Sequence, residues 1–467
     1  MTPHPTARHL RRWTGPVLGA SVLAVLAALA PARAETLAGA LAKAYQNNPS
    51  INAVRAAQRA LDEGVAIAKS GYRPQVGVTL DYGISSVDGA SGGPRTQGTL
   101  SVNQTLFDGF RRKNAVRSAK AGVFAGQEDL AATEQSILLS AVQAYVAVIQ
   151  NQRIVGLLSE NVSFLEEQLR ASNARFEVGE GTRTDVAQAR ADRAAALGDL
   201  EAARANLRSS EALYLQIVGS PPTNLQPARI PARSVPHTID AAVSRALSHN
   251  PAIRRAQFLV EQASFDVKRN EGAFLPTLTG TASATRTRGA VGRNPLTGGS
   301  IRTTTDTLSA GVQLSVPLYQ GGAASAQVRQ SKELLSQSRI QVDVARRNVR
   351  EATVRAFSDY QAALASRTSV DAQIAAAQEA LRGLIEERSV GQRTTLDVLL
   401  GRQTLVNAQI LRVQNEAQLV AAGYGVLNAM GKLSVRALHL PVREHEPDEH
   451  YVAVKDKWYG LRTPDQR

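Results

Sequence analysis

Two stretches that lie far apart in the chain have nearly the same sequence. VGEGTRTD occupies residues 178–185 and VGQRTTLD occupies residues 390–397, so 390 − 178 gives an offset of 212 residues. The same offset relates Leu106-Phe-Asp-Gly109 to Leu318-Tyr-Gln-Gly321. A repeat of this length is far longer than a solenoid unit, so the pattern indicates one internal duplication rather than a stacked array.

The duplication continues toward the N-terminus with a shorter offset. Asn48-Pro49 matches Asn250-Pro251 and Pro74 matches Pro276, both at 202 residues. The difference, 212 − 202 = 10 residues, falls in glycine-rich stretches of each copy. We expect these stretches to be outward-facing loops of unequal length, since loops tolerate insertions; they comprise residues 83–96 and 288–304.

The first 34 residues have the three parts of a secretory signal peptide. Arginines at positions 8, 11 and 12 precede an apolar run over residues 17–30, and Ala32-Arg33-Ala34 provides a small-residue cleavage site. A spanning helix needs about 20 apolar residues, so we expect cleavage after Ala34 and export. The mature chain then has a first repeat at residues 35–230, a second at 231–433 and a C-terminal tail at 434–467.

Composition narrows the class of exported protein. The chain has no cysteine, so it can form no disulfide and lacks the acylated cysteine of a lipoprotein. Its net charge of +14 loses four arginines with the signal peptide, and 14 − 4 leaves +10. Such a surplus can indicate nucleic-acid binding. The arginines are dispersed among alanines and glutamines without interleaved aromatic residues, so we interpret them as solvated helix faces and expect no nucleic-acid partner.

Two long helices are predicted at residues 109–179 and 321–391, neither of which contains a proline. Apolar residues recur every seven positions, the spacing typical of a coiled coil, and a four-residue step after Ala144 acts as a stutter. The first seam begins at Val116, Val123, Leu130 and Ile137, and a second contains Leu138, Tyr145, Leu158 and Leu165. Seventy helical residues span about 100 Å at 1.5 Å per residue. Shorter helices are expected at residues 51–73, 184–218, 253–275 and 396–430.

Four segments alternate apolar and polar residues with a period of two, which predicts β-strands arranged as one hairpin in each repeat. They lie at residues 76–84, 97–107, 277–287 and 308–318. A tilted strand of about 10 residues can cross a bilayer. A soluble sheet with one packed face has the same alternation, so the alternation alone does not distinguish the two.

The mature sequence has no apolar run near the length of a spanning helix, so a membrane crossing requires a closed barrel. Four strands cannot close, because the smallest membrane barrels use about eight. Three chains would supply twelve strands and set their helices side by side in a ring. The predicted fold class is therefore mainly α with a β-barrel part: two structural repeats, a tunnel of long coiled-coil helices and a trimeric transmembrane barrel.

At this point the chain resembles the TolC family of outer-membrane efflux proteins over nearly its whole mature length. The residues that carry the resemblance are the paired Asn-Pro motifs, the two matching prolines, LFDG, LYQGG and the two VGxxT turns. The resemblance implies a homotrimeric duct in the outer membrane of a Gram-negative bacterium that extends into the periplasm. It also implies a periplasmic adaptor and an inner-membrane pump of RND or ABC type as partners, and no cofactor. The exported cargo is left undetermined.

The duplicated turns have a local explanation. Gly179 and Gly391 suit the left-handed ends of the long helices. Thr182-x-x-Asp185 and Thr394-x-x-Asp397 have the spacing of capping boxes for the helices that follow.

The resemblance adds a functional interpretation of the same turns. It implies that Asp397 lines the narrowest ring of the tunnel entrance and that Asp185 and Arg393 take part in polar links that lock it. Arg388 stands where the family often has a tyrosine in that lock, and Leu400 replaces a frequent second ring aspartate. The adaptor-docking tips would comprise Val178, Gly179, Thr182, Asp185, Val390, Gly391, Arg393 and Thr394.

Two other classes of exported protein fit the sequence less well. An enzyme is not expected, because the chain has no cysteine and no H-E-x-x-H motif. Histidines and glutamates cluster near the C-terminus, but their irregular spacing favours a solvated tail over a metal site; they are His439, His445 and His450 with Glu444, Glu446 and Glu449. A periplasmic adaptor is also exported and rich in long helices, but it would not carry two amphipathic strand hairpins in register with its repeats.

Overall fold

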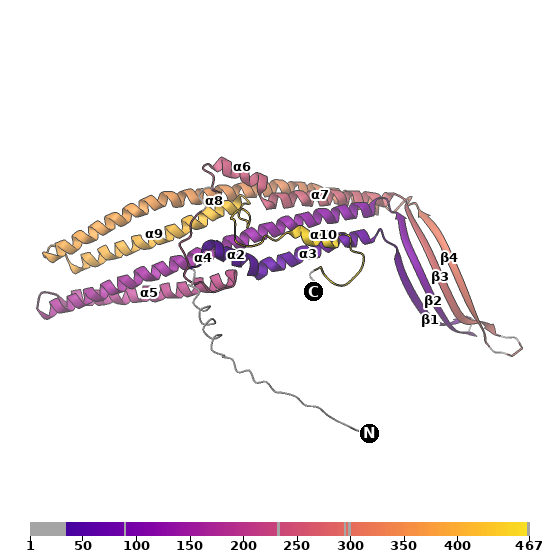
Figure 1. Ribbon diagram of the computed structural model, residues 1–467, viewed down its shortest axis with the longest axis horizontal. Coiled ribbons are helices and arrows are strands. Elements are labelled where there is room, and N and C mark those ends of the chain that lie inside the picture. The colour runs from indigo at the N-terminus through magenta and orange to yellow at the C-terminus, as the bar shows by residue number, and fades with distance from the viewer. Residues whose placement is uncertain (1–33, 88–89, 231–233, 294–295, 298–299, 465–467) are drawn as a thin grey trace, which may run out of the picture.

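The computed structural model describes residues 34–464 except 88–89, 231–233, 294–295 and 298–299 (Figure 1). The predicted signal peptide lies almost entirely outside the described residues. The first repeat contains α2 (Leu37–Asn47), α3 (Pro49–Ser70), β1 (Gln75–Val87), β2 (Ala90–Phe107), α4 (Arg111–Glu177) and α5 (Arg183–Val218). The second contains α6 (Ile239–His249), α7 (Pro251–Glu271), the 3₁₀ turn η2 (Gly272–Phe274), β3 (Thr277–Arg293), β4 (Ser300–Ser315), α8 (Ala323–Ser389) and α9 (Thr395–Ala429), and α10 (Pro447–Val454) follows.

The two long helices, α4 and α8, have 67 residues each and run from the sheet at one end of the molecule to helical hairpins at the other (Figure 1). Both predicted seams of α4 contribute to its packing, and the second is the more deeply buried. Leu138 and Tyr145 are fully buried, while Val116 and Ile137 of the first seam are half-buried. α4 therefore contacts neighbouring helices on more than one side, as a helix in the middle of a helical layer does.

The shorter helices follow one another end to end along α4 and α8, and the duplicated Asn-Pro motif makes each joint. Asn48 Oδ1 accepts a hydrogen bond from Ser50 N (2.9 Å) and caps α3, while Asn48 Nδ2 donates to Ile217 O (2.9 Å) at the end of α5. Asn250 bridges α7 and α9 in the same way, with bonds to Ala252 N and Ala429 O of 2.9 Å each. One side chain therefore satisfies backbone groups of two helix ends.

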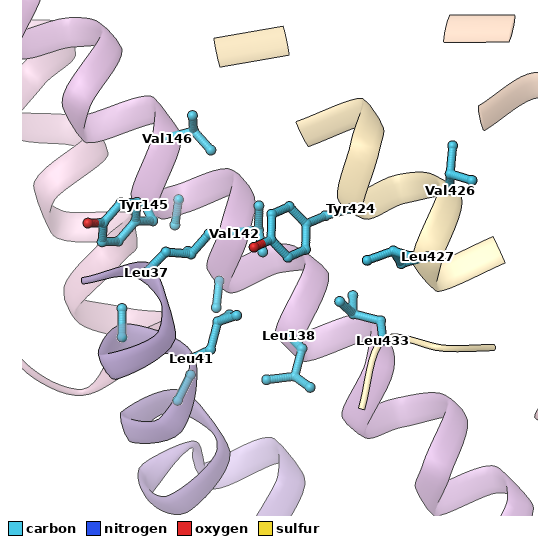
Figure 2. Close-up of a cluster of buried hydrophobic side chains, with 14 of the residues drawn as sticks. Leu37, Leu41, Leu138, Val142, Tyr145, Val146, Tyr424, Val426, Leu427 and Leu433 are labelled. Carbon is cyan, nitrogen blue, oxygen red and sulfur yellow. The ribbon is translucent and has the colours of Figure 1, made fainter. Parts of the chain in front are cut away.

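The largest core cluster lies near these joints, where helices of both repeats meet (Figure 2). Tyr145 and Tyr214 are fully buried, with ring centroids 6.3 Å apart. The Tyr145 hydroxyl lies 2.8 Å from Glu35 O and 2.7 Å from Gln226 O, so it anchors the chain on both sides of the first repeat.

The four strands form one antiparallel sheet in the order β1-β2-β3-β4, because the two predicted hairpins pair with each other through β2 and β3. Both hairpins have the same register: Gln75 pairs with Asn103, and Thr277 pairs with Ser315 at offsets of 202 and 212. The strands are 13 to 18 residues long and extend into the segments predicted as loops. That loop prediction was wrong over most of its length, because paired strands satisfy their own backbone groups beyond the apolar region.

One face of the sheet is apolar and uncovered. Val76, Leu80 and Leu308 are 65, 79 and 84% exposed. The opposite face is polar: Thr99 and Thr285 hydroxyls lie 3.2 Å apart, and Ser283 and Ser309 hydroxyls lie 2.8 Å apart. A soluble sheet would bury its apolar face against protein, so this arrangement favours lipid contact.

Among the described residues, one helix, α4, contains an 18-residue window apolar enough to cross a membrane. The sequence-based expectation concerned an uninterrupted apolar run, and α4 contains none of that length, because polar residues interrupt every such stretch. The window is 44% buried inside the chain. By length and composition alone this is weak evidence for a span, and a buried core helix has the same properties.

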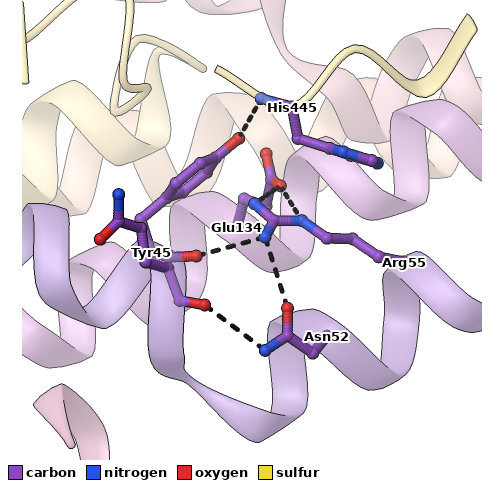
Figure 3. A network of polar contacts seen from close by, with 6 residues as sticks. Tyr45, Asn52, Arg55, Glu134 and His445 are labelled. Atoms are coloured by element: carbon purple, nitrogen blue, oxygen red, sulfur yellow. Dashed lines mark hydrogen bonds and ion pairs between the residues drawn. The ribbon is translucent and has the colours of Figure 1, made fainter. Parts of the chain in front are cut away.

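The tail is docked rather than solvated, which corrects the sequence-based expectation. α10 packs along α3, where His450 Nδ1 lies 2.9 Å from the fully buried Asp62 Oδ2. His445 N donates to the Tyr45 hydroxyl (3.0 Å), and Arg55 lies over the Tyr45 ring while pairing with Glu134 (2.9 Å; Figure 3). Within the described part of the chain, no group of three or more metal-ligating side chains gathers there or elsewhere.

Candidate tunnel entrance

The first tip, residues 178–185, reverses the chain between α4 and α5. Gly179 has a φ of 82°, and the amides of Glu180 and Gly181 donate to Arg175 O at 2.9 and 3.1 Å, which ends α4. Asp185 Oδ2 then accepts from Thr182 N (3.1 Å) while Asp185 N donates to Thr182 Oγ1 (3.1 Å). This reciprocal pair confirms the predicted capping box.

The second tip, residues 390–397, has the same construction between α8 and α9. Gly391 has a φ of 81°, and Asp397 Oδ2 accepts from Thr394 N (2.9 Å) and Thr394 Oγ1 (2.8 Å). The backbone hydrogen bond from Thr394 and then that from its hydroxyl hold the pKa of Asp397 below its usual range. The carboxylate is therefore charged at neutral pH, and its capping contribution is lost only as the pH falls through that depressed pKa.

Charged residues of the two tips are engaged within their own chain. Arg393 Nε pairs with Glu387 Oε2 at 2.8 Å, and this hydrogen bond and charge raise the pKa of Arg393. Arg388 Nη1 donates to Gln168 Oε1 at 2.7 Å and so connects α8 with α4. Burial, and then the nearby Arg175, lower the pKa of Arg388. Among the described residues, no hydrogen bond or ion pair joins Asp185 to Arg393 within the chain, so a link between them stays a prediction about neighbouring chains.

Apolar side chains project from both tips. Val178 is 71% exposed and Val390 is 70% exposed. Leu400, one turn into α9, is 58% exposed. Single exposed apolar residues are normal on a protein surface, so a contact surface at these two valines stays a prediction.

Sequence reasoning missed the polar contacts just behind the tips. Arg402 Nε donates to Asn161 Oδ1 (3.3 Å), and its guanidinium lies 5.0 Å from the Phe164 ring centre. Arg193 pairs with Glu166 at 2.8 Å between α5 and α4. In each case the partners lie on different helices, 27 residues apart for Arg193 with Glu166 and 241 for Arg402 with Asn161, so no spacing within one helix predicts them.

An uncovered apolar sheet face, two long helices of about 100 Å and exposed hairpin tips at their far end together define a subunit of an outer-membrane export channel. The chain belongs to the Outer membrane efflux protein family, whose profile matches residues 40–220 and 242–432. The two matched segments correspond to the two repeats.

Known relatives agree with this assignment. The chain is 48% identical over 453 residues to the outer membrane efflux protein BepC of Brucella suis biovar 1 (strain 1330), covering 97% of this chain and 96% of that protein. It is 26% identical over 423 residues to the outer membrane protein TolC of Escherichia coli (strain K12), covering 87 and 84%. The solved Campylobacter jejuni CmeC outer membrane channel has the same fold, with a TM-score of 0.75, 16% identity and coverage of 90 and 89%. The chain is a channel subunit of the outer membrane, and the adaptor alternative does not fit.

Proposed function

We propose that three copies of the chain form a continuous duct, and that this duct is the exit of a tripartite efflux or type I secretion system. The observation that carries the proposal is the open sheet with one lipid-compatible face. The outer edges of β1 and β4 are not paired with any strand among the described residues, and lipid cannot satisfy the backbone groups there. Three sheets of four strands close into a barrel without edges.

The duplication supports a specific pairing between chains. Within the chain, β2 of the first repeat pairs with β3 of the second, and Val102 lies opposite Ala282. In the other repeat, Val102 is equivalent to Leu314 of β4 (102 + 212) and Ala282 is equivalent to Leu80 of β1 (282 − 202). If neighbouring chains pair as the two repeats do, Leu314 lies opposite Leu80 of the next chain. The next pair is Val312 opposite Tyr82, so apolar residues again share one face. A register that keeps the barrel's outer face apolar supports the repeat-derived pairing.

The helices support the same assembly. α7 packs against α4 within the chain, so the equivalent α3 should pack against α8 of a neighbour. On α3, the face equivalent to the side of α7 that packs against α4 consists mainly of small residues and is largely uncovered. It comprises Ala53, Ala56, Ala60, Gly64 and Ile67, and Ile67 is 72% exposed.

The pairing can be tested with cysteines, since the natural chain has none. Leu80→Cys combined with Leu314→Cys should link three chains covalently, because opposed residues bring their Cβ atoms to about 5 Å. After mild oxidation, the product should migrate as a trimer on a heated, non-reducing gel. The control is Ile84→Cys with Leu314→Cys, which displaces one thiol about 13 Å along the strand and should give monomers. Trimers from the control pair alone would refute the register.

At the opposite end, three chains would bring six tips together around the tunnel axis. Asp397 would line the narrowest ring there, and Arg393, Arg388 and Asp185 would belong to the polar links that hold the entrance closed. The exposed Val178 and Val390 of the tips, with Gly179, Thr182, Gly391 and Thr394, would meet a periplasmic adaptor, which couples the duct to an inner-membrane pump. Deleting the gene should abolish the export of that pump's cargo, and wild-type cargo export in the deletion strain would contradict the role.

A further inference from the structure

A basic pocket lies at the base of the sheet, where α3 and α4 meet β1 and the end of the tail covers them. Its volume is about 500 Å³. Five of its lining residues are cationic: Lys69, Arg73, Lys113, Arg117 and Lys120. The pocket is also lined by Asp456 and Trp458 of the tail and by Pro74, the residue before β1 begins.

The cations in this pocket are largely uncompensated. Asp456 is the one lining carboxylate, so 5 − 1 leaves a charge of +4, and it pairs with Lys69. Arg73 lies 4.5 Å from the Trp458 ring centre and donates to Lys457 O at 3.0 Å. Within the described ranges, no ion pair joins Lys113, Arg117 or Lys120 to a carboxylate. Like charges gathered in one concave site favour binding of an anion.

The second repeat provides an internal comparison, because its α7–α8 groove has the same fold without this charge. At offsets of 202 and 212, Lys69 corresponds to Glu271, Arg73 to Leu275 and Lys113 to Ser325. Arg329 and Lys332 are retained, and Lys332 pairs with Glu271 at 3.5 Å. The groove can therefore fold without five cations, so we infer that the extra positive charge of the first repeat has a role other than folding.

The position of the pocket indicates which anion it meets. Val76, two residues beyond Pro74, is 65% exposed on the apolar side of the sheet. Trp458, Tyr459 and Leu461 of the tail are 70, 90 and 104% exposed. Exposed tryptophan and tyrosine at the end of a lipid-facing sheet are typical of the membrane–water interface, where phospholipid phosphates lie. A water-filled bore would not favour three such side chains.

We propose that this pocket binds the phosphate of a phospholipid headgroup in the periplasmic leaflet of the outer membrane, with a preference for an anionic lipid. Lys113, Arg117 and Lys120 would contact the phosphate, and Trp458 would lie beside the glycerol and upper acyl chain. This inference rests on the outer-membrane location of the chain and not on the entrance or its partners.

The first test uses the fluorescence of Trp458, which is the single tryptophan of the mature chain if the signal peptide is removed. The chain has two tryptophans, Trp13 and Trp458, and cleavage after Ala34 leaves Trp458 alone. The exported channel would be reconstituted in phosphatidylglycerol vesicles whose acyl chains carry bromine near the headgroup. Emission from Trp458 should be quenched relative to unbrominated vesicles and should resist aqueous iodide. Quenching by iodide but not by bromolipid would overturn the placement of the pocket against lipid.

The second test compares matched pairs of charges in the two repeats. Arg117→Gln with Lys120→Gln should weaken phosphatidylglycerol binding to the detergent-purified channel about tenfold or more, measured by native mass spectrometry. Arg329→Gln with Lys332→Gln, the equivalent pair, should change it less than about twofold. Heat-resistant oligomer on an unboiled gel reports that each variant folds. Equal weakening by both pairs, or none by the first, would refute the site.

Competition separates a lipid from a free phosphate. Phosphatidylcholine should compete weakly, because its headgroup has no net charge, and free glycerol phosphate should not displace phosphatidylglycerol at equal concentration. If glycerol phosphate displaces the lipid fully, the pocket recognises soluble phosphate compounds, and the lipid assignment is wrong.

Discussion

Replacing Asp397 with alanine should remove most of the channel's cation selectivity and its block by trivalent metal ions in planar bilayers. In the proposed trimer, three Asp397 carboxylates converge on the threefold axis, raise the local cation concentration and give multivalent cations a binding site. Leu400 provides no second acidic ring, so one substitution should account for most of the effect. Within one chain, the hydrogen bonds from Thr394 hold the pKa of Asp397 below its usual range, which opposes the rise that two neighbouring carboxylates would cause.

Asparagine at position 397 separates charge from capping. Its amide oxygen can still accept the Thr394 hydrogen bonds, whereas alanine loses them and keeps only the bond from its backbone N–H to Thr394 Oγ1, at a cost of about 0.5–1.5 kcal/mol of local stability. Asp185 controls for the ring charge alone, because its capping box has the same geometry but the proposal places it in the lock and not in the narrowest ring. We expect Asp397→Asn to abolish the block and Asp185→Asn to retain it. If Asp397→Asn is blocked like the natural channel while Asp397→Ala is not, Asp397 is only a helix cap.

Gly109→Ala should prevent stable folding of the junction between the helices and the sheet. Gly109 has a φ of 66°, and an added Cβ would lie 2.4 Å from Gly272 O and 2.7 Å from Leu275 Cβ. Left-handed strain costs about 1–2 kcal/mol, and forcing two backbones apart in a packed junction adds about 3 kcal/mol or more. The yield of heat-resistant channel from outer membranes should fall to a small fraction of the natural level.

Gly179 is the control for the backbone strain alone. Its φ is 82°, and an added Cβ there would meet nothing within 4 Å. Gly179→Ala should therefore lower the yield only slightly, by the cost of left-handed strain. Equal losses for Gly109→Ala and Gly179→Ala would show that strain, and not the contact with Gly272, makes Gly109 necessary.

The candidate site was only partly predictable. The capping boxes of Thr182 with Asp185 and of Thr394 with Asp397 depend on groups three residues apart, so their spacing was sufficient evidence. The partner of Arg388 is Gln168, 220 residues away, and it became visible only in the folded chain. The irregular spacing of the tail histidines likewise gave no sign that His450 contacts Asp62, 388 residues earlier.

The sequence by itself determined the elements of this protein: two repeats, two long helices, four amphipathic strands and capped turns. The repeats follow from comparison of one half of the chain with the other, and the helices, strands and turns follow from a period of seven, a period of two or a short spacing along one segment, which local geometry imposes. Only the tertiary structure decided that the two hairpins join through β2 and β3, and that Asn48 joins two helix ends across 169 residues. It also decided that five cations gather beside Trp458. These contacts join residues far apart in the sequence. The pattern of one segment is compatible with many partners, and only the packing of the whole chain selects one.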